Sequence, residues 1–254
     1  CANGAASHIA PRLLRELGAD VTAIACKPDG ININNKCGST HLEQLQKAVV
    51  NAQADLGVAY DGDADRLLAV DEDGNVVDGD RLLMIFGSYL KEQGLLAEDT
   101  VVVTVMSNMG LKMALKEKGI KTLDTKVGDR YVIEGMKESG AVLGGEQSGH
   151  IVFGLDNTTG DGILSSVKLL QIVKQSKRSL KDLAAEMEQY PQILINVKVK
   201  EKHGWESKAE IQQAIVAAQQ ELGETGRILV RASGTENLLR VMVEGKQQEQ
   251  IEQL

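Results

Sequence analysis

The sequence predicts an α/β protein, with two similar α/β domains that have mixed sheets and a smaller α+β domain after them. Its 254 residues exceed what one ordinary core accommodates. Short apolar runs alternate with amphipathic stretches up to about residue 188, a pattern typical of α/β domains. Beyond that point the chain changes to strands grouped around one helix. We therefore expect domains at residues 1–77, 78–188 and 189–254.

The first expected domain alternates helix and strand. Its elements are a helix over 7–17, a strand over 20–26, a helix over 40–52, and strands over 56–60 and 67–70. Ser7 is interpreted as the cap of the first helix, and Thr40 with Glu43 as a capping box for the second. The βαβ order favours parallel pairing of its strands.

The second and third expected domains differ in the order of their helices and strands. Asp78 or Asp80 caps a helix at the start of the second domain. That domain's elements are helices over 81–93, 111–118, 131–138, 160–177 and 180–188, with strands over 101–106, 121–124 and 141–143. The third domain's elements are strands over 193–199, 226–230 and 238–243 and a helix over 206–221.

Composition and charge exclude several classes of partner. A net charge of -8 and a pI of about 5.2 argue against nucleic-acid and anionic-membrane surfaces. Aromatic residues make up only 3%, too few for base-stacking platforms. No apolar stretch has the length of a membrane span, and residue 1 opens no signal peptide. Cys1, Cys26 and Cys37 lack the paired spacing of zinc or redox motifs, so we expect reduced thiols and a cytoplasmic location.

The segment from residue 61 to 66 carries three carboxylates at alternating positions, directly after an apolar strand. Asp61, Asp63 and Asp65 are hard oxygen ligands of the kind that suit Mg²⁺ or Mn²⁺, and Arg66 beside them indicates phosphate chemistry. Together with Glu72 the spacing matches an EF-hand calcium loop, but Arg66 stands where that loop needs glycine. A solvated acidic turn is the other interpretation, although three adjacent carboxylates repel one another unless a cation is present.

A polar segment between the last two expected strands has the chemistry of a phosphate site. It offers hydroxyl, backbone-amide and guanidinium donors from Arg231, Ser233, Gly234, Thr235 and Arg240. These groups would hold a phosphate that is not reacting. An ordinary hairpin turn is the alternative, because Ser-Gly-Thr also occurs there.

Two further loops carry weaker signals. In Gly-Gly-Glu-Gln-Ser-Gly-His, Glu146 and Ser148 are suited to bind sugar hydroxyls, and His150 to transfer a proton or contact phosphate. A structural role is the alternative for His150. Lys126 and Arg130 lie around a glycine at a helix start, where an anion is favoured, with a solvated loop as the alternative.

These loops, in this order and at strand ends, resemble those of the α-D-phosphohexomutase superfamily. The resemblance covers essentially the whole chain and lies in the metal loop 61–66, the sugar loop 145–150 and the phosphate loop 231–236. Segments 104–108, 125–131 and 157–162, and Gln147, look most like the phosphoglucosamine mutase branch. The implied reaction interconverts glucosamine 6-phosphate and glucosamine 1-phosphate through a phosphoserine and a bisphosphorylated sugar.

The resemblance implies a role for each of these residues and a TATA-binding-protein-like fold for the last domain. Asp61, Asp63 and Asp65 would hold Mg²⁺, and Arg66 would lie beside the phosphoserine. Glu146 and Ser148 would bind the sugar hydroxyls of a hexosamine phosphate. The residues implied to hold the distal phosphate, the one that is not reacting, are Arg231, Ser233, Gly234, Thr235 and Arg240. The residues implied to help in catalysis are Lys126, Arg130 and His150.

The sequence departs from the superfamily in one respect. The phosphoserine motif of the first domain, usually Ser-His-Asn-Pro, does not occur here, and Ser7-His8 lacks its Asn-Pro. We therefore expect a fragment that is inactive alone and that needs the N-terminal domain of the same enzyme, with a homodimer as a further expectation. A phosphomannomutase or phosphoglucomutase is the alternative enzyme, and a non-catalytic sugar-phosphate- or metal-binding protein is the alternative from another class.

Overall fold

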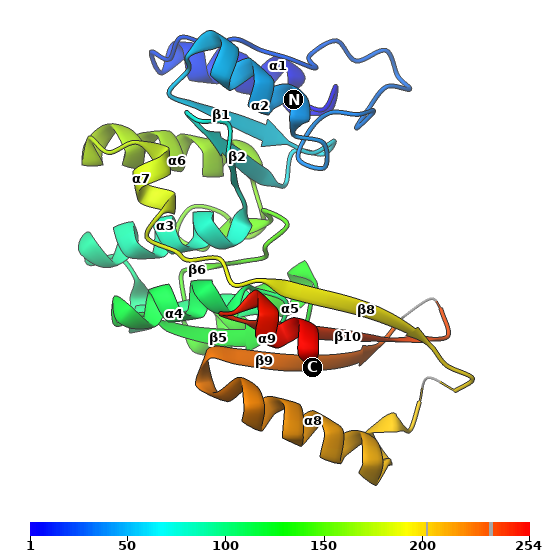
Figure 1. The fold of residues 1–254 in the computed structure, drawn as a ribbon. Coiled ribbons are helices and arrows are strands. Elements are labelled where there is room, and N and C mark those ends of the chain that lie inside the picture. Colours follow the sequence, from blue (N-terminus) through cyan, green and yellow to red (C-terminus); the bar gives the residue numbers. More distant parts are fainter. Residues whose placement is uncertain (202, 234–235) are drawn as a thin grey trace. The chain divides into compact units, whose positions relative to one another are not determined.

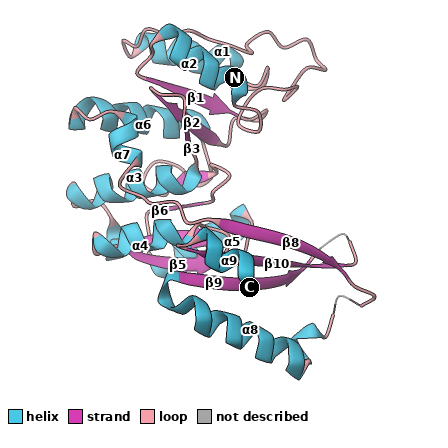
Figure 2. Cartoon of the chain, in the orientation of Figure 1, coloured by secondary structure: helices cyan, strands magenta, loops and turns pink. Residues whose placement is uncertain are grey.

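The computed structural model describes residues 1–201, 203–233 and 236–254, which form two compact units, Cys1–Glu188 and Gln189–Leu254 (Figures 1 and 2). The helices of the first unit are α1 (Ala6–Glu16), α2 (Glu43–Ala52), α3 (Gly79–Glu92), α4 (Met109–Glu117), α5 (Asp129–Ser139), α6 (Gly162–Ser176) and α7 (Leu180–Ala184). Its strands are β1 (Leu56–Tyr60), β2 (Leu67–Asp71), β3 (Val76–Val77), β4 (Thr100–Thr104), β5 (Lys121–Thr125), β6 (Leu143–Gly145) and β7 (Ile151–Phe153).

The first sheet is an antiparallel meander in the order β1-β2-β3. Tyr60 pairs with Leu67, so the six intervening residues form a loop whose two ends are held together by the sheet. In Figure 1, β1 and β2 lie between α2 and α6, both of which contact the two strands. The acidic segment therefore projects from a rigid edge.

The second sheet has the order β5-β4-β6-β7, with β4 parallel to β5 and β6 and with β7 antiparallel at one edge. Side chains of β4 alternate between its two faces. Val101 and Val103 belong to the cluster that includes α3 and α4, whereas Val102 packs with Val132 and Met136 of α5. Helices thus cover both faces of this sheet, as expected for a largely parallel sheet.

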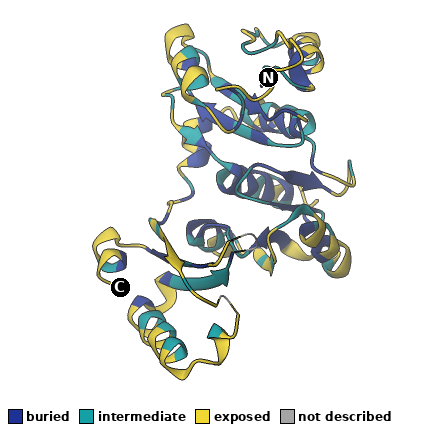
Figure 3. Cartoon of the chain, turned by 90° about the vertical axis from the view of Figure 1, so that its right-hand side faces the viewer, coloured by how far each residue is buried: buried dark blue, intermediate teal, exposed yellow. Residues whose placement is uncertain are grey.

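One apolar core runs through both sheets of the first unit. It joins Tyr60 and Leu67 of the first sheet to Phe86 of α3 and Leu143 of the second sheet. Figure 3 shows the buried residues concentrated in these strands and in the inner faces of the helices. Asp78 caps α3 by accepting a hydrogen bond from the Arg81 backbone N–H at 3.1 Å, as predicted. The division between residues 77 and 78 stays a prediction.

The second unit is an α+β arrangement. Its elements are β8 (Gln192–Lys198), α8 (Ala209–Leu222), β9 (Gly226–Ala232), β10 (Leu238–Gly245) and α9 (Gln248–Gln253). The sheet is antiparallel in the order β8-β10-β9, and its small core combines Leu222, Val243 and Ile251. Glu244 is fully buried, where its carboxylate accepts from Arg227 Nε at 2.6 Å and from Gln192 Nε2 at 2.7 Å, linking all three strands.

The predicted fold class is confirmed, but the strand expected over 20–26 is wrong. In the structure this segment is irregular, and it is held by bonds from the Cys1 amine to the Ile24 carbonyl and from Asn3 N–H to the Ala25 carbonyl. An apolar run becomes a strand only when a neighbouring strand pairs with it. The parallel pairing expected in the first domain fails for the same reason, because β1 pairs with β2 through a short antiparallel connection.

Two predicted helix caps are also wrong. Ser7 lies inside α1, which begins at Ala6, and it is buried rather than placed at the helix end. α2 begins at Glu43, so Thr40 lies too far upstream to cap it. The preceding turn is fixed instead by the Ser39 N–H, which donates to the Tyr60 carbonyl at 3.0 Å. Among the described residues, no helix has the length and apolar character needed to cross a bilayer.

Candidate active site

The loop between β1 and β2 gathers three carboxylates. Asp61, Asp63 and Asp65 each offer an oxygen within 4.8 Å of the others. The Arg66 N–H donates to Asp61 Oδ1 at 3.2 Å, and the Ala64 N–H to the Asp61 carbonyl at 3.3 Å, so the loop folds back on itself. Alternating acidic positions therefore converge where an extended strand would have spread them along one face.

The electrostatics of this loop fit a divalent cation. Burial raises the pKa of Asp61 to about 6, assisted by a hydrogen bond with Asp65 and by the charges of Asp65 and Asp63. The hydrogen bond from the Arg66 backbone N–H lowers the pKa of Asp61 and offsets this rise only in part. Arg66 Nε lies 3.7 Å from Asp61 Oδ2 and 3.9 Å from Asp65 Oδ1. Asp65 Oδ1 is buried and accepts no hydrogen bond within the described part of the chain. Crowded oxygens of this kind are the donor set that Mg²⁺ prefers.

Glu72 does not belong to this cluster. Its carboxylate accepts from the Lys181 N–H at 3.3 Å, at the start of α7. The segment after Arg66 is β2 rather than a continuing loop. Both observations exclude the EF-hand interpretation, which needs Glu72 as the last ligand.

The sugar loop is fastened directly to the metal loop. The Leu67 N–H donates to the Gly149 carbonyl at 3.0 Å, and Arg66 and His150 form a β-bridge. The Gly162 N–H, at the start of α6, donates to the Ala64 carbonyl at 2.9 Å. Three segments that are far apart in the sequence are therefore held together by backbone hydrogen bonds.

The polar side chains of the sugar loop are held in place by a contact with the segment that precedes α5. Glu146 Oε1 accepts from the Gly128 N–H at 2.9 Å, and Ser148 Oγ donates to Glu146 Oε2 at 3.4 Å. Gly128 precedes α5, so the segment 125–131 meets the sugar loop here. Each of Glu146 and Ser148 is partly exposed and so remains accessible to a ligand.

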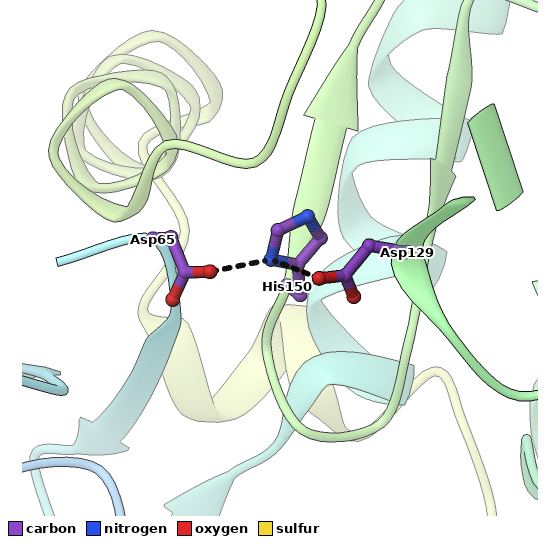
Figure 4. A group of neighbouring side chains, drawn as sticks. All are labelled: Asp65, Asp129 and His150. Carbon is purple, nitrogen blue, oxygen red and sulfur yellow. Dashed lines mark hydrogen bonds and ion pairs between the residues drawn. The ribbon is translucent and has the colours of Figure 1, made fainter. Parts of the chain in front are cut away.

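His150 joins the two loops at the side-chain level (Figure 4). Its Nδ1 lies 3.1 Å from Asp65 Oδ2 and 3.7 Å from Asp129 Oδ2, and its Nε2 accepts from the Gly160 N–H at 3.2 Å. Sequence reasoning missed Asp129, although it lies between Gly128 and Arg130 in the segment that had been singled out. Gly160 likewise lies in the segment 157–162, whose glycine gave no signal of its own.

Lys126 and Arg130 make local contacts. Lys126 Nζ lies 5.7 Å from the centre of the Tyr131 ring. Arg130 Nε pairs with Glu134 at 2.7 Å along the exposed face of α5. Their roles as helpers in catalysis stay predictions.

In the second unit, Arg231 and Arg240 lie directly opposite each other on β9 and β10. Like charges in cross-strand pairs destabilise a sheet unless an anion lies between them. Arg240 Nε is buried without a hydrogen-bond partner in the described part of the chain. Ser233 Oγ accepts from the Glu236 N–H at 3.3 Å, and Gly234 and Thr235 lie outside the described residues.

Family models match nearly the whole chain. The phosphoglucomutase/phosphomannomutase α/β/α domain II matches residues 1–74, domain III residues 78–190, and the C-terminal domain residues 194–254. The chain belongs to this family. Two of the solved structures that share its fold are also members or relatives by name. A phosphoglucomutase/phosphomannomutase family protein from Burkholderia thailandensis superposes with a TM-score of 0.81 at 23% identity, covering 100% of this chain and 57% of that one. The N-acetylphosphoglucosamine mutase of Aspergillus fumigatus superposes with a TM-score of 0.75 at 22% identity, covering 96% of this chain and 61% of that one.

Within the family, the chain is similar to bacterial phosphoglucosamine mutases. It is 56% identical to that of Heliobacterium modesticaldum over 253 residues, covering 100% of this chain and 55% of the relative. It is also 56% identical to that of Carboxydothermus hydrogenoformans, covering 96% of this chain and 55% of the relative. The chain thus spans about half the length of the curated relatives it matches.

Proposed function

We propose that this chain forms the metal-, sugar- and phosphate-binding part of a phosphoglucosamine mutase, which interconverts glucosamine 6-phosphate and glucosamine 1-phosphate. The observation that carries the proposal is the backbone junction between Leu67 and Gly149, which unites a carboxylate triad with a hydroxyl-binding loop. Sequence identity of 56% to a bacterial phosphoglucosamine mutase favours this substrate over mannose or glucose phosphates. The phosphoserine would come from the family's first domain, which is not among the three that match.

In this proposal each loop has its own task. Asp61, Asp63 and Asp65 would hold Mg²⁺, and the ion would supply neutralisation of the charge on the phosphoryl group. Arg66, ion-paired to two of these carboxylates, would lie beside the reacting phosphate and offer it guanidinium donors. Glu146 accepts hydrogen bonds from sugar hydroxyls, a role supported by its partly exposed carboxylate.

The distal phosphate is held in the second unit. Arg231 and Arg240 supply two guanidinium groups on neighbouring strands, and Ser233 adds a hydroxyl. The parts proposed for Gly234 and Thr235 come from the sequence alone, since both lie outside the described residues. A bisphosphorylated sugar that turns over must present either phosphate to this cradle. Recognition there therefore has to depend on the phosphate and not on which sugar oxygen bears it.

Substitution of Asp63 by Asn tests whether metal and phosphate have separate sites. The change removes one anionic ligand, so we expect the Kd for Mg²⁺ to rise about tenfold or more, equivalent to about 1.4 kcal/mol. Binding of glucosamine 6-phosphate through Arg231 should remain largely intact. Isothermal titration calorimetry with each ligand measures both, and Asp55→Asn, at an exposed position before β1, is the control with the same charge change.

Two results would contradict the proposal. Equal loss of metal and phosphate affinity in Asp63→Asn would contradict separate sites. In coupled assays on the complete enzyme, a preference for mannose or glucose phosphate would transfer the assignment to a phosphomannomutase or phosphoglucomutase. The non-catalytic alternative is tested by reading the encoded residues upstream of Cys1 for a Ser-His-Asn-Pro motif.

The proposal extends to location and assembly. Three free thiols, Cys1, Cys26 and Cys37, suit a reducing cytoplasm, where an amino-sugar phosphate would be made for cell-wall precursors. The homodimer stays a prediction that sedimentation velocity would check.

A further inference from the structure

Asp129 is a carboxylate beside the sugar loop that has no part in the proposed function. It is the first residue of α5, and its side chain is 44% exposed. Its Oδ2 lies 3.7 Å from His150 Nδ1, which is longer than an ordinary hydrogen bond. Figure 4 shows the carboxylates of Asp129 and Asp65 directed toward the same imidazole. Asp129 therefore lies where the sugar loop meets the metal loop, with its oxygens open to a ligand.

The charge of Asp129 has no cationic side chain beside it. Within the described part of the chain, neither a lysine nor an arginine forms an ion pair with its carboxylate. The two cations that are nearest in the sequence have other partners, since Lys126 Nζ lies over the Tyr131 ring and Arg130 pairs with Glu134. A half-exposed carboxylate of this kind can receive a cationic group of a ligand.

The backbone holds Asp129 next to the residue that we propose binds sugar hydroxyls. The N–H of Gly128, which directly precedes Asp129, donates to Glu146 Oε1 at 2.9 Å. Gly128 has φ +128°, a conformation that residues with a side chain rarely adopt, so this close approach depends on glycine. The carboxylates of Glu146 and Asp129 therefore lie within reach of one sugar ring.

The proposed substrate carries a group that a second carboxylate would recognise. Glucosamine differs from glucose only at C2, where an amino group replaces a hydroxyl. Such an amine resembles an α-amino group, whose pKa is about 7.7–8.0, so at about pH 7 it is mostly an ammonium. Glu146 can accept from hydroxyls of either sugar and cannot distinguish them. A carboxylate at C2 can, because the ammonium gains an ion pair that the hydroxyl does not.

We propose that Asp129 binds the 2-ammonium group of glucosamine 6-phosphate and thereby selects the amino sugar. This inference rests on the proposed function. When the 6-phosphate is the distal phosphate, the reacting end of the sugar is C1, and C2 is the adjacent ring carbon. Asp129 lies at that end, because it shares the contact to His150 with Asp65 of the metal loop. In glucosamine 1-phosphate the distal phosphate is on C1, so C2 lies away from Asp129.

Binding of four sugar phosphates to the full chain tests this selectivity. Calorimetry in saturating Mg²⁺ at about pH 7 gives the Kd of glucosamine 6-phosphate, of glucose 6-phosphate and of the two corresponding 1-phosphates. We expect the wild type to bind glucosamine 6-phosphate about fivefold more tightly than glucose 6-phosphate, the upper end for an exposed ion pair. The two 1-phosphates should bind equally. Equal binding of the two 6-phosphates by the wild type would overturn the inference, and this measurement needs no stable variant.

Asp129→Asn keeps the shape of the side chain and removes its charge. We expect glucosamine 6-phosphate to lose about fivefold in affinity and glucose 6-phosphate to change by less than about twofold. Glu138→Gln is the control, because it removes the same charge from an exposed position roughly 13 Å further along α5. The control should leave the ratio of the two Kd values unchanged.

The remaining outcomes separate this role from its alternatives. Equal losses for both 6-phosphates in Asp129→Asn would assign the residue to the placement of His150 or to the stability of α5, and would overturn the inference. A Kd for Mg²⁺ that rises about tenfold in the same variant would make Asp129 a metal ligand and would overturn it too. Failure of the wild type to bind any of the four sugar phosphates would instead contradict the proposed function itself.

Discussion

Burial disfavours the ionised form of Asp61, one of the three proposed metal ligands. Its carboxylate is nearly buried, and the pKa of about 6 lies above the ordinary range for aspartate, so the metal-free fold favours the protonated form. The resulting contribution to stability is fully present below about pH 4 and is lost as the pH rises through about 6. A bound cation reverses this preference because it requires the ionised form.

Proton release on metal binding follows from this shift. At about pH 6 the metal-free Asp61 is partly protonated, so Mg²⁺ binding should expel a fraction of a proton. At about pH 8 the release should vanish. Calorimetric titrations in two buffers with different heats of ionisation measure the number of protons released. Identical binding heats in both buffers at about pH 6 would show that Asp61 is already ionised and would contradict the prediction.

Residue chemistry predicted the cluster of three carboxylates but not its neighbours. Asp61, Asp63 and Asp65 could be singled out because they alternate within one short loop. Repulsion among their carboxylates can therefore be inferred from the sequence spacing alone. Asp129 approaches His150 because α5 begins beside the sugar loop. The sequence around Asp129 does not predict that contact. Tertiary neighbours of this kind need the sheet order before they can be named.

At the scale of elements, the junction between β2 and the sugar loop requires a glycine. Gly149 has φ +91°, and a Cβ there would lie 2.2 Å from the Leu67 carbonyl oxygen. The same residue accepts the Leu67 N–H. Any side chain at 149 would therefore separate the strand that follows the carboxylate triad from the loop that we propose binds the sugar.

Gly149→Ala should destabilise the first unit and weaken Mg²⁺ binding. Gly94→Ala is the matched control, because Gly94 also has positive φ, +66°, but has open space around it. We expect the control to cost about 1–2 kcal/mol for the left-handed backbone, and Gly149→Ala at least about 2 kcal/mol more for the steric overlap. Urea denaturation followed by circular dichroism measures both. Equal destabilisation would show that the overlap relaxes without consequence.

Elements were predictable where one segment suffices to define them. The positions of β1, β2 and α3 follow from apolar periodicity and from Asp78 as a cap, all of which are local. The strand expected at 20–26 and the parallel pairing were wrong because each depends on a neighbour that local pattern does not specify. The short strand β7 was missed, since its three residues are defined as a strand only by their pairing with β6 across the turn at Gly149.

At the scale of the molecule, the proposed metal and phosphate sites belong to different compact units. The carboxylate triad lies in Cys1–Glu188, and Arg231 with Arg240 in Gln189–Leu254. The protein's single tryptophan, Trp205, lies in the second unit. Its fluorescence therefore reports the unfolding of that unit, while far-ultraviolet circular dichroism is dominated by the larger first unit.

Mg²⁺ and phosphate should consequently protect different parts of the chain from heat. A ligand at about 100 times its Kd stabilises the unit that binds it by about 2.7 kcal/mol, because only the folded form binds. We expect Mg²⁺ to raise the circular-dichroism transition and glucosamine 6-phosphate to raise the Trp205 transition. In Arg231→Gln the second shift should disappear and the first remain. A Trp205 transition that rises with Mg²⁺ alone would show that the metal stabilises the second unit too, and separate sites with separate effects would then be untenable.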